Sequence, residues 1–244
     1  MAASVEVERE KELVGQAAAE LVESGMTVGL GTGSTVAYLL PALAARGLEV
    51  RCLTSSPATE RAARVLGLQV ESFVGPEALA HVDLTIDGAD QVTPSGWLVK
   101  GGGGAHTREK ALAAAADRFV VIVSSNKMVQ RPSSPIPLEL LAYGLAATRA
   151  RLGHIRLRDA PRSPDGGVIA DYLGEIDDPG ATALRLSSTT GVIEHGLFAP
   201  ALVSEILVGR GDRVDRVTMR RAAGLEQCRF AGGRDPRNGG SQRP

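Results

Sequence analysis

The sequence is poor in cysteine, histidine and aromatic residues. Its 244 residues include two cysteines, four histidines and 3% aromatic residues. The two cysteines, Cys52 and Cys228, are too few and too far apart to indicate a disulfide framework or a cysteine zinc site, so two unpaired thiols in a reducing cytosol are expected. His81 and His106 have no recognisable metal-ligand spacing with the nearby aspartates. We therefore expect no bound metal.

A long apolar run and an excess of charge of one sign are also missing. The 27 basic and 28 acidic residues give a formal charge of -1, so no overall field draws the protein to nucleic acid or to an anionic membrane. No apolar run reaches the roughly 18 residues that a membrane span needs. Residues 1–13 lack the basic start and apolar core of a secretory signal. These absences predict a cytoplasmic protein whose partner is a small molecule, not nucleic acid or a membrane.

Strand and helix patterns alternate through the first half of the chain. Apolar spacing predicts strands at 27–30, 49–53, 82–86 and 119–123, and helices at 10–22, 36–45, 58–66 and about 107–116. Such alternation is typical of an α/β fold with a mostly parallel sheet and helices on both faces.

Prolines at 132, 135 and 137 break this alternation. A second pattern follows, with a helix at 138–152, strands at 154–158 and 168–172, and then another helix and strand, which predicts an α+β subdomain of ferredoxin-like size. Segments 205–208 and 213–218 are strand candidates that can return to the first sheet. We expect one domain of residues 1–131 with 204–219, a second of residues 132–203, and a disordered, arginine- and glycine-rich tail at 220–244.

A glycine-rich segment, Gly29 to Thr35, lies where a predicted strand passes into a helix. Its amides and the helix N-terminus point at one place, where a phosphate binds well. The segment lacks the lysine of a Walker loop, and Ser34 replaces the third glycine of the dinucleotide fingerprint. A site for a single phosphate is therefore favoured over a nucleotide site, with a purely structural turn as the alternative.

Two carboxylates follow the strand at 82–86, in the sequence Asp87-Gly88-Ala89-Asp90. Open α/β sheets bind ligands at this carboxyl end of the strands. A solvated Asp-Gly turn is the alternative interpretation, and for these residues alone it is the stronger one.

Four consecutive glycines after Lys100 form the most unusual segment of the chain. Their entropic cost is high, so close approach of the backbone to a ligand explains them better than a flexible linker does. The amides of Gly101, Gly102 and Gly103 can form an oxyanion nest beside the Lys100 ammonium. Glu109 follows in the first turn of the next helix, where a favourable interaction with the helix dipole is the alternative to a catalytic role.

Five strings, GLGTGSTV, LTSSPATE, DGAD, KGGGGAHTREK and SSNKMV, occur in an order and spacing that resemble the type A ribose-5-phosphate isomerase family over about residues 8–219. The resemblance implies a Rossmann-like domain with a ferredoxin-like lid, a homodimer or higher homo-oligomer, and no metal or organic cofactor. It implies interconversion of D-ribose 5-phosphate and D-ribulose 5-phosphate through an enediolate. It also implies that Glu109 is the catalytic base, that Asp87, Asp90 and Lys100 surround the sugar, and that Thr32, Gly33, Ser34, Thr35, Lys127 and Lys11 lie near the phosphate.

Some features depart from the family pattern or leave the roles open. Gln91 stands where an acidic residue is common and His106 where an aliphatic one is common, and we expect His106 to be partly exposed at a helix start. Asp87 is assigned to ring opening and Asp90 to orienting Lys100 or a sugar hydroxyl. A sugar-phosphate sensor and an amino-sugar-phosphate deaminase are the alternative functions. Too few residues precede Lys11 for the helix-turn-helix that such a sensor carries.

Overall fold

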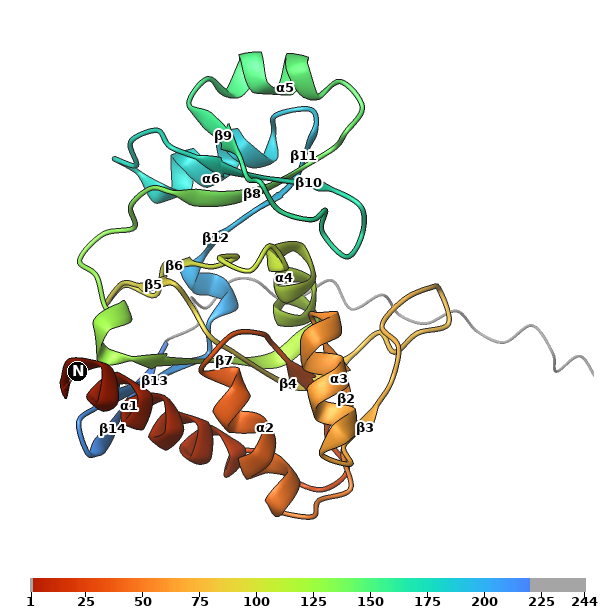
Figure 1. The fold of residues 1–244 in the computed structure, drawn as a ribbon, viewed down its shortest axis with the longest axis vertical. Coiled ribbons are helices and arrows are strands. Elements are labelled where there is room, and N and C mark those ends of the chain that lie inside the picture. Colours follow the sequence, from red (N-terminus) through yellow and green to blue (C-terminus); the bar gives the residue numbers. More distant parts are fainter. Residues whose placement is uncertain (1, 220–244) are drawn as a thin grey trace, which may run out of the picture.

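The structure, a computed structural model, describes residues 2–219, so the tail predicted at 220–244 lies outside the described residues. A seven-stranded sheet forms its base, in the order β14-β13-β7-β4-β1-β2-β3 (Figure 1). All neighbouring pairs are parallel except the hairpin of β13 with β14. The strands are β1 (Thr27–Leu30), β2 (Arg51–Thr54), β3 (Gln69–Val70), β4 (Val82–Asp87), β7 (Ala116–Ser124), β13 (Glu205–Arg210) and β14 (Arg213–Thr218).

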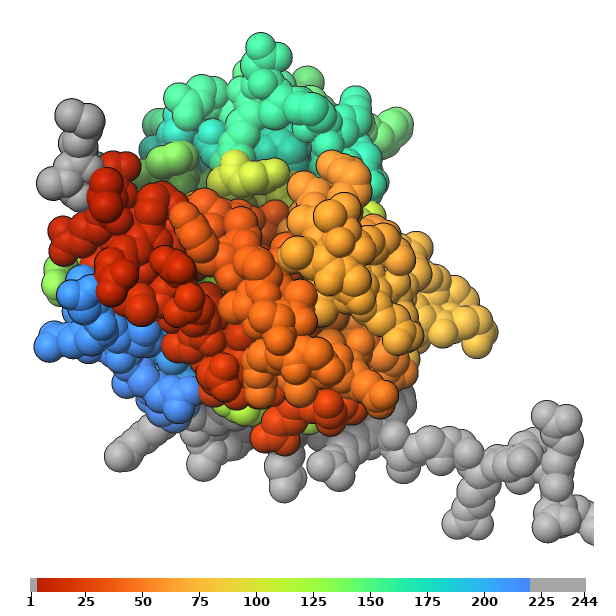
Figure 2. Space-filling view, turned by 60° about the horizontal axis from the view of Figure 1, so that its bottom comes forward, coloured from red at the N-terminus to blue at the C-terminus, as the bar shows by residue number. Residues whose placement is uncertain are grey.

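Helices cover both faces of this sheet, which confirms the predicted α/β fold. Three of them lie side by side on one face (Figure 2): α1 (Ala2–Ala19), α2 (Val36–Ala45) and α3 (Pro57–Val65). Helix α4 (His106–Ala115) lies on the other face (Figure 1). Side chains along a strand alternate between faces. In β7, Val120 and Ile122 therefore pack in the cluster of α1 and α2, whereas Val121 and Val123 pack in a cluster with Ala113 of α4.

A second, antiparallel sheet lies above α4 in Figure 1, in the order β11-β8-β10-β9. Its strands are β8 (Ile136–Leu140), β9 (Ile155–Leu157), β10 (Val168–Tyr172) and β11 (Val192–His195), and its helices are α5 (Leu145–Leu152) and α6 (Pro179–Ser187). The chain enters this sheet at β8 and re-enters the large sheet at β13. We therefore keep the division into residues 1–131 with 204–219 and residues 132–203 as a proposal.

The prediction of a helix at 138–152 is wrong for residues 138–144. Residues 136–140 form strand β8, and the helix begins only at Leu145, after Gly144 with φ +70°. Leu138, Leu141 and Leu145 fit a helical spacing. The structure instead buries Leu138 and Leu140, which pack as alternate residues of a strand in the core of the second sheet. The period of the pattern was therefore assigned wrongly.

Three two-residue strands form a small sheet between the two larger ones: β5 (Gln91–Val92), β6 (Leu98–Val99) and β12 (Leu197–Phe198). Short 3-10 turns, η1 (Ser125–Lys127) and η2 (Pro200–Leu202), follow β7 and β12. None of the helices within residues 2–219 combines the length and the apolar composition required to cross a membrane.

Candidate active site

The strand order creates a crevice between β1 and β4, because the chain leaves β1 toward β2 on one side and leaves β4 toward β7 on the other. The loops after these two strands meet there. The Gly31 N–H donates to the Ile86 carbonyl at 2.9 Å, and a Cβ at position 31 would lie 1.9 Å from the Asp87 carboxylate. Only glycine permits this approach. The phosphate-loop candidate and the DGAD segment are therefore adjacent, as predicted.

A buried cation with two carboxylates lies at the base of the crevice. The Lys100 Nζ is 2.9 Å from Asp87 Oδ2 and 3.3 Å from Glu109 Oε2, and all three side chains are at most 3% exposed. The ammonium also donates to the Gly88 carbonyl. Asp87 Oδ1 accepts the N–H groups of Thr32 at 3.1 Å and of Gly88 at 2.7 Å. Asp87 is thus held by three neighbours, whereas Glu109 contacts the cation from the side that faces the pocket.

The protonation states follow from burial and from the excess of carboxylates. Burial raises the pKa of Glu109 to about 7, with the Lys100 ammonium lowering it and the Asp87 charge raising it further. Burial acts to lower the pKa of Lys100, but the Asp87 and Glu109 carboxylates outweigh it, so that the pKa of Lys100 is raised. Near neutral pH the site therefore holds a charged lysine beside a glutamate that can gain or lose a proton.

A pocket of about 140 Å³ opens above this group. The residues that line it include most of the predicted ones: Thr32, Gly33, Ser34, Thr35, Asp90, Lys100, Gly101, Gly102, Gly103, Glu109 and Lys127. Asp87 lies behind Lys100 and does not line the pocket. The lining combines the hydroxyls of the first loop with the amides of the glycine run.

Hydroxyls at the N-terminus of α3, from its capping residue and its first turn, hold the first loop in place. The Ser56 hydroxyl donates to Thr32 Oγ1 at 3.0 Å, and the Thr59 hydroxyl donates to the Gly31 carbonyl at 2.9 Å. Both residues belong to the LTSSPATE string, to which sequence reasoning gave no role of its own. They position the loop without lining the pocket.

Lys127 reaches the pocket, but Lys11 does not. Glu10 of α1 is 2% exposed and accepts both the N–H and the hydroxyl of Ser125, at 2.8 and 2.9 Å, which fixes the turn that carries Lys127. The Lys11 ammonium instead pairs with Glu8 at 2.7 Å, one helical turn away. Lys11, which the family resemblance placed near the phosphate, therefore does not line the pocket. Glu10 is a positioning residue that the sequence did not reveal.

The run of glycines from Gly101 to Gly104 is held by Asp90 and packs against His106. Asp90 Oδ2 accepts the Gly102 N–H at 2.8 Å. We expected this amide to be a free donor for an oxyanion, but it is already bound to Asp90. Gly101 has φ +99°, and a Cβ there would lie 2.7 Å from His106. His106 is fully buried beneath the run, and burial followed by the charge of Lys110 lowers its pKa to about 4. The expectation of a partly exposed His106 is wrong.

Helix α4 contacts the second sheet through residues on either side of Glu109. The Thr107 hydroxyl donates to Glu139 of β8, and the Lys110 ammonium pairs with Glu194 of β11 at 2.7 Å. Arg108 forms an ion pair at 2.7 Å with Asp165, in the loop before β10. The base candidate therefore lies on a helix turn that the second sheet holds in place.

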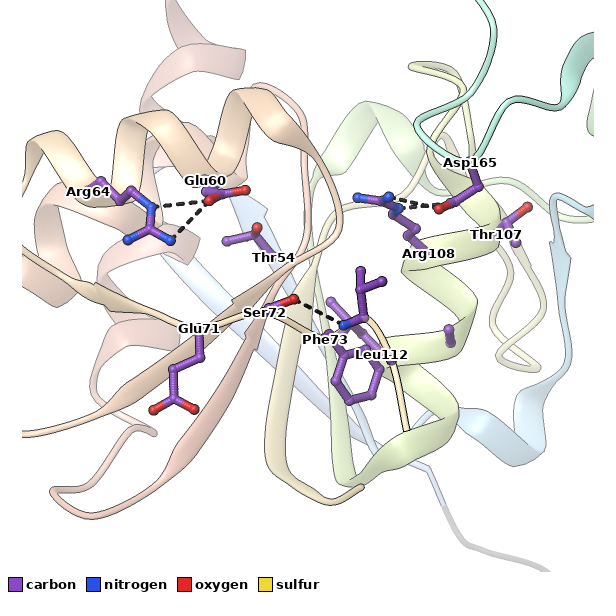
Figure 3. A pocket seen from close by; sticks show the side chains of 13 residues that line it. Thr54, Glu60, Arg64, Glu71, Ser72, Phe73, Thr107, Arg108, Leu112 and Asp165 are labelled. Atoms are coloured by element: carbon purple, nitrogen blue, oxygen red, sulfur yellow. Dashed lines mark hydrogen bonds and ion pairs between the residues drawn. The ribbon is translucent and has the colours of Figure 1, made fainter. Parts of the chain in front are cut away.

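A larger cleft of about 450 Å³ lies between α3 and α4 (Figure 3). Figure 3 shows Arg64 turned toward Glu60 and Arg108 turned toward Asp165, and both pairs are substantially exposed. The cleft has a larger volume than the crevice pocket, but both of its arginines are already paired with carboxylates and are exposed. The reactive arrangement is the buried one at the strand ends.

His81, Asp83 and Asp117 are a possible metal-binding group within residues 2–219. The His81 Nε2 lies 3.5 Å from Asp83 and 3.3 Å from Asp117. This group lies at the amino ends of β4 and β7, the opposite edge of the sheet from the crevice, and exposed acidic groups of this kind are common. It takes no part in the site.

Comparison with known proteins agrees with this geometry. The family described as ribose 5-phosphate isomerase A (phosphoriboisomerase A) matches residues 51–213. The chain belongs to the ribose 5-phosphate isomerase A family. A ribose-5-phosphate isomerase A from Caulobacter vibrioides is 45% identical over 224 residues, which cover 85% of this chain and 97% of that protein.

Solved structures of ribose 5-phosphate isomerases share the fold. The enzyme from Neisseria gonorrhoeae aligns with a TM-score of 0.82 and 28% identity, over 88% of this chain and 98% of that one. A D-ribose-5-phosphate isomerase in complex with phospho-erythronic acid aligns with a TM-score of 0.80 and 30% identity, over 87% and 99% of the two chains. Both sheets of the chain thus lie within the family's architecture.

Proposed function

We propose that this protein interconverts D-ribose 5-phosphate and D-ribulose 5-phosphate by moving a proton between two neighbouring carbons. One observation carries the proposal: a buried Lys100 ammonium pairs with Glu109 at the wall of a pocket whose rim is the loop from Thr32 to Thr35. The pocket thus combines a base, a cation and an anion-binding loop. The names of the relatives favour the isomerase over a sugar-phosphate sensor or an amino-sugar-phosphate deaminase.

Glu109 is the base in this mechanism. Its carboxylate takes the C2 proton of the open-chain aldose and returns it to C1, since a pKa near 7 lets the same group accept and donate at neutral pH. Loss of the C2 proton places negative charge on the oxygens of an enediolate. The Lys100 ammonium stabilises that charge, and one well-placed donor in such a site contributes on the order of 3 kcal/mol.

The two aspartates take roles opposite to those expected from the sequence. Asp87 contacts Lys100 and lies behind it, so we assign it to orienting the ammonium. Asp90 is exposed, lines the pocket and holds Gly102, and the ring-opening proton movement between sugar hydroxyls falls to it. The pocket lining distinguishes the two, because Asp90 lines the pocket whereas Asp87 lies behind Lys100 and does not.

The phosphate lies at the loop hydroxyls and Lys127 in this proposal. Ser34 and Thr35 precede α2, and neither hydroxyl caps that helix. We expect Ser34→Ala with Thr35→Ala to raise KM for ribose 5-phosphate at least about tenfold and to weaken inhibition by inorganic phosphate in parallel, because each lost hydrogen bond to a charged group is worth about 1.5–3 kcal/mol. Steady-state kinetics with phosphate as inhibitor measure both effects.

Ser188→Ala with Thr189→Ala is the matched control. This adjacent Ser-Thr pair bonds to carbonyls of its own helix α6 and lies outside the pocket lining. Both kinetic values should stay at wild-type level. Unchanged phosphate inhibition in the Ser34 and Thr35 variant would place the anion elsewhere.

The direct test of the function is conversion of ribose 5-phosphate by the full chain in EDTA. We expect full turnover, because the pocket carboxylates are engaged by Lys100 and by the Gly102 amide rather than arranged around an ion site. Ammonia release from glucosamine 6-phosphate, measured in parallel, should be absent. Lack of isomerisation would overturn the proposed function, and loss in EDTA with recovery on adding a divalent ion would overturn the metal-free mechanism.

We further propose that the protein works without a cofactor in the cytoplasm, as a homodimer or higher homo-oligomer. The family resemblance supports this proposal, and analytical ultracentrifugation of the full chain measures its mass directly.

A further inference from the structure

Arg158 connects the second sheet to the glycine run of the pocket. It follows strand β9, and its Nη1 donates to the carbonyls of Gly101 at 3.0 Å and of Gly102 at 2.9 Å. Its Nε and Nη2 donate to Asp171 Oδ1 on β10, at 3.0 and 2.7 Å. Asp171 is 4% exposed. A buried carboxylate therefore fixes the guanidinium while its remaining edge holds two consecutive peptide carbonyls.

The positions of these carbonyls determine where the amides point. In a planar trans peptide the C=O of one residue and the N–H of the next point in opposite directions. Carbonyls of Gly101 and Gly102 that face Arg158 therefore turn the N–H groups of Gly102 and Gly103 away from it. The Gly102 N–H reaches Asp90 Oδ2 at 2.8 Å, which agrees with this geometry.

Gly103 is left with an unused donor. Within residues 2–219 its N–H has no protein acceptor, and Gly103 lines the reaction pocket. Arg158 lines a neighbouring cleft that shares Thr32, Gly102 and Gly103 with this pocket. The guanidinium thus binds the carbonyl side of the run, and the peptide geometry turns the Gly103 N–H away from it.

We propose that Arg158 is a positioning residue that directs the Gly103 N–H into the pocket, where it donates to the enediolate oxygen. This inference rests on the isomerase function proposed above. Glycine peptides have no side chain to bias them and rotate at little cost, so an external contact has to select one orientation. A cation bound to the Gly102 carbonyl also polarises the same peptide group and strengthens its N–H as a donor. Arg158 thereby does two things for one amide.

Arg156 provides a matched control. It lies within β9 and pairs with the same Asp171, at 3.3 Å, but its side chain is 64% exposed, and within residues 2–219 it has no hydrogen bond to the glycine run. Arg156→Met and Arg158→Met remove the same chemical group and one partner of the same carboxylate. Only Arg158→Met also removes the hydrogen-bond donor of the Gly101 and Gly102 carbonyls.

The experiment compares the two variants with wild type in the full chain. Arg158→Met should lower kcat about 10²-fold, the effect of removing one oxyanion donor, and should leave KM for ribose 5-phosphate within about threefold. Exchange of the C2 hydrogen with solvent deuterium should slow by the same factor. Arg156→Met should keep kcat within about twofold. Arg158→Lys, which retains the charge without the planar fork, should lie between the two.

Equal kcat in Arg158→Met and Arg156→Met would overturn the inference, and so would a higher KM with unchanged kcat. If Arg158→Met does not fold, as judged by circular dichroism, Arg158→Lys decides: wild-type kcat overturns the inference, and a loss of at least about fivefold at unchanged KM supports it. Absence of turnover in both wild type and Arg156→Met would instead overturn the proposed function.

Discussion

Replacement of Glu109 by glutamine should lower kcat for ribose 5-phosphate by at least about 10³-fold, in the upper part of the range for general base catalysis. Glutamine keeps the size and polarity of the side chain but cannot accept a proton from carbon. KM should change less than about threefold, because the loop hydroxyls and Lys127 still bind the phosphate. The chemical step alone is therefore affected.

The same variant should lose a pH dependence. Since burial raises the pKa of Glu109 to about 7, the carboxylate is protonated below that value and cannot act as a base. In wild type, kcat/KM should rise with pH up to about 7 and then level off. In Glu109→Gln the residual rate should show no such rise. A pH–rate profile from about 5 to 9 for both proteins measures the difference.

Exchange of the C2 hydrogen with solvent deuterium, followed by NMR, isolates the proton-transfer step of Glu109→Gln. Glu60→Gln is the matched control, because Glu60 also lies in the first turn of its helix, α3, but pairs with Arg64 outside the pocket. A dipole effect would change both variants equally. Exchange at near wild-type rate in Glu109→Gln would transfer the role of base to Asp90, the other carboxylate that lines the pocket.

Removal of the Lys100 ammonium should be nearly as damaging. Lys100→Met should lower kcat about 10²- to 10³-fold, because the enediolate loses its main cation. It should also destabilise the fold by about 3–5 kcal/mol, since two buried carboxylates remain without their cation. The Lys100 charge lowers the pKa of Glu109, so its loss should move the acid limb of the pH profile to higher pH.

Lys110→Met separates catalysis from stability in this test. Both ammonium groups lie over the Phe198 ring, at 5.6 Å for Lys100 and 4.8 Å for Lys110, but Lys110 pairs with Glu194 outside the pocket. The control should therefore lose stability in urea unfolding, but its loss of kcat should be much smaller than that of Lys100→Met, because Lys110 contacts the second sheet and not the pocket. Wild-type turnover in Lys100→Met would refute the assignment of Lys100.

The sequence predicted best those elements in which the apolar pattern and the residues that mark the ends indicate the same bounds. Strand 27–30 and helix 36–45 have the predicted bounds, because an apolar run and a glycine loop mark them clearly. Strands β5, β6 and β12 have two residues each, too few for any period to show. Helix α1 begins at Ala2, earlier than predicted, because its first residues form no buried face that a pattern would mark: Val5 is 70% exposed.

The site residues were predictable where they lie in short motifs, as Asp87, Lys100 and Glu109 do. Residues that position the site but lie far from these motifs in sequence were not predictable. Glu10 contacts Ser125 across 115 positions of sequence, and Arg158 contacts Gly101 across 57. Neither has a local pattern that distinguishes it from a surface charge. Their roles depend on tertiary contacts that the sequence does not display.

The contacts of α4 determine which parts of this enzyme can be exchanged with those of a relative to make a chimera. Thr107, Arg108 and Lys110 each bind a different segment of the second sheet, while Glu109 between them faces the pocket. Residues 132–203 are therefore not an interchangeable module. A chimera that takes this part from another member of the family has to inherit α4 and the glycine run with it, or match Glu139, Asp165 and Glu194 to the retained helix.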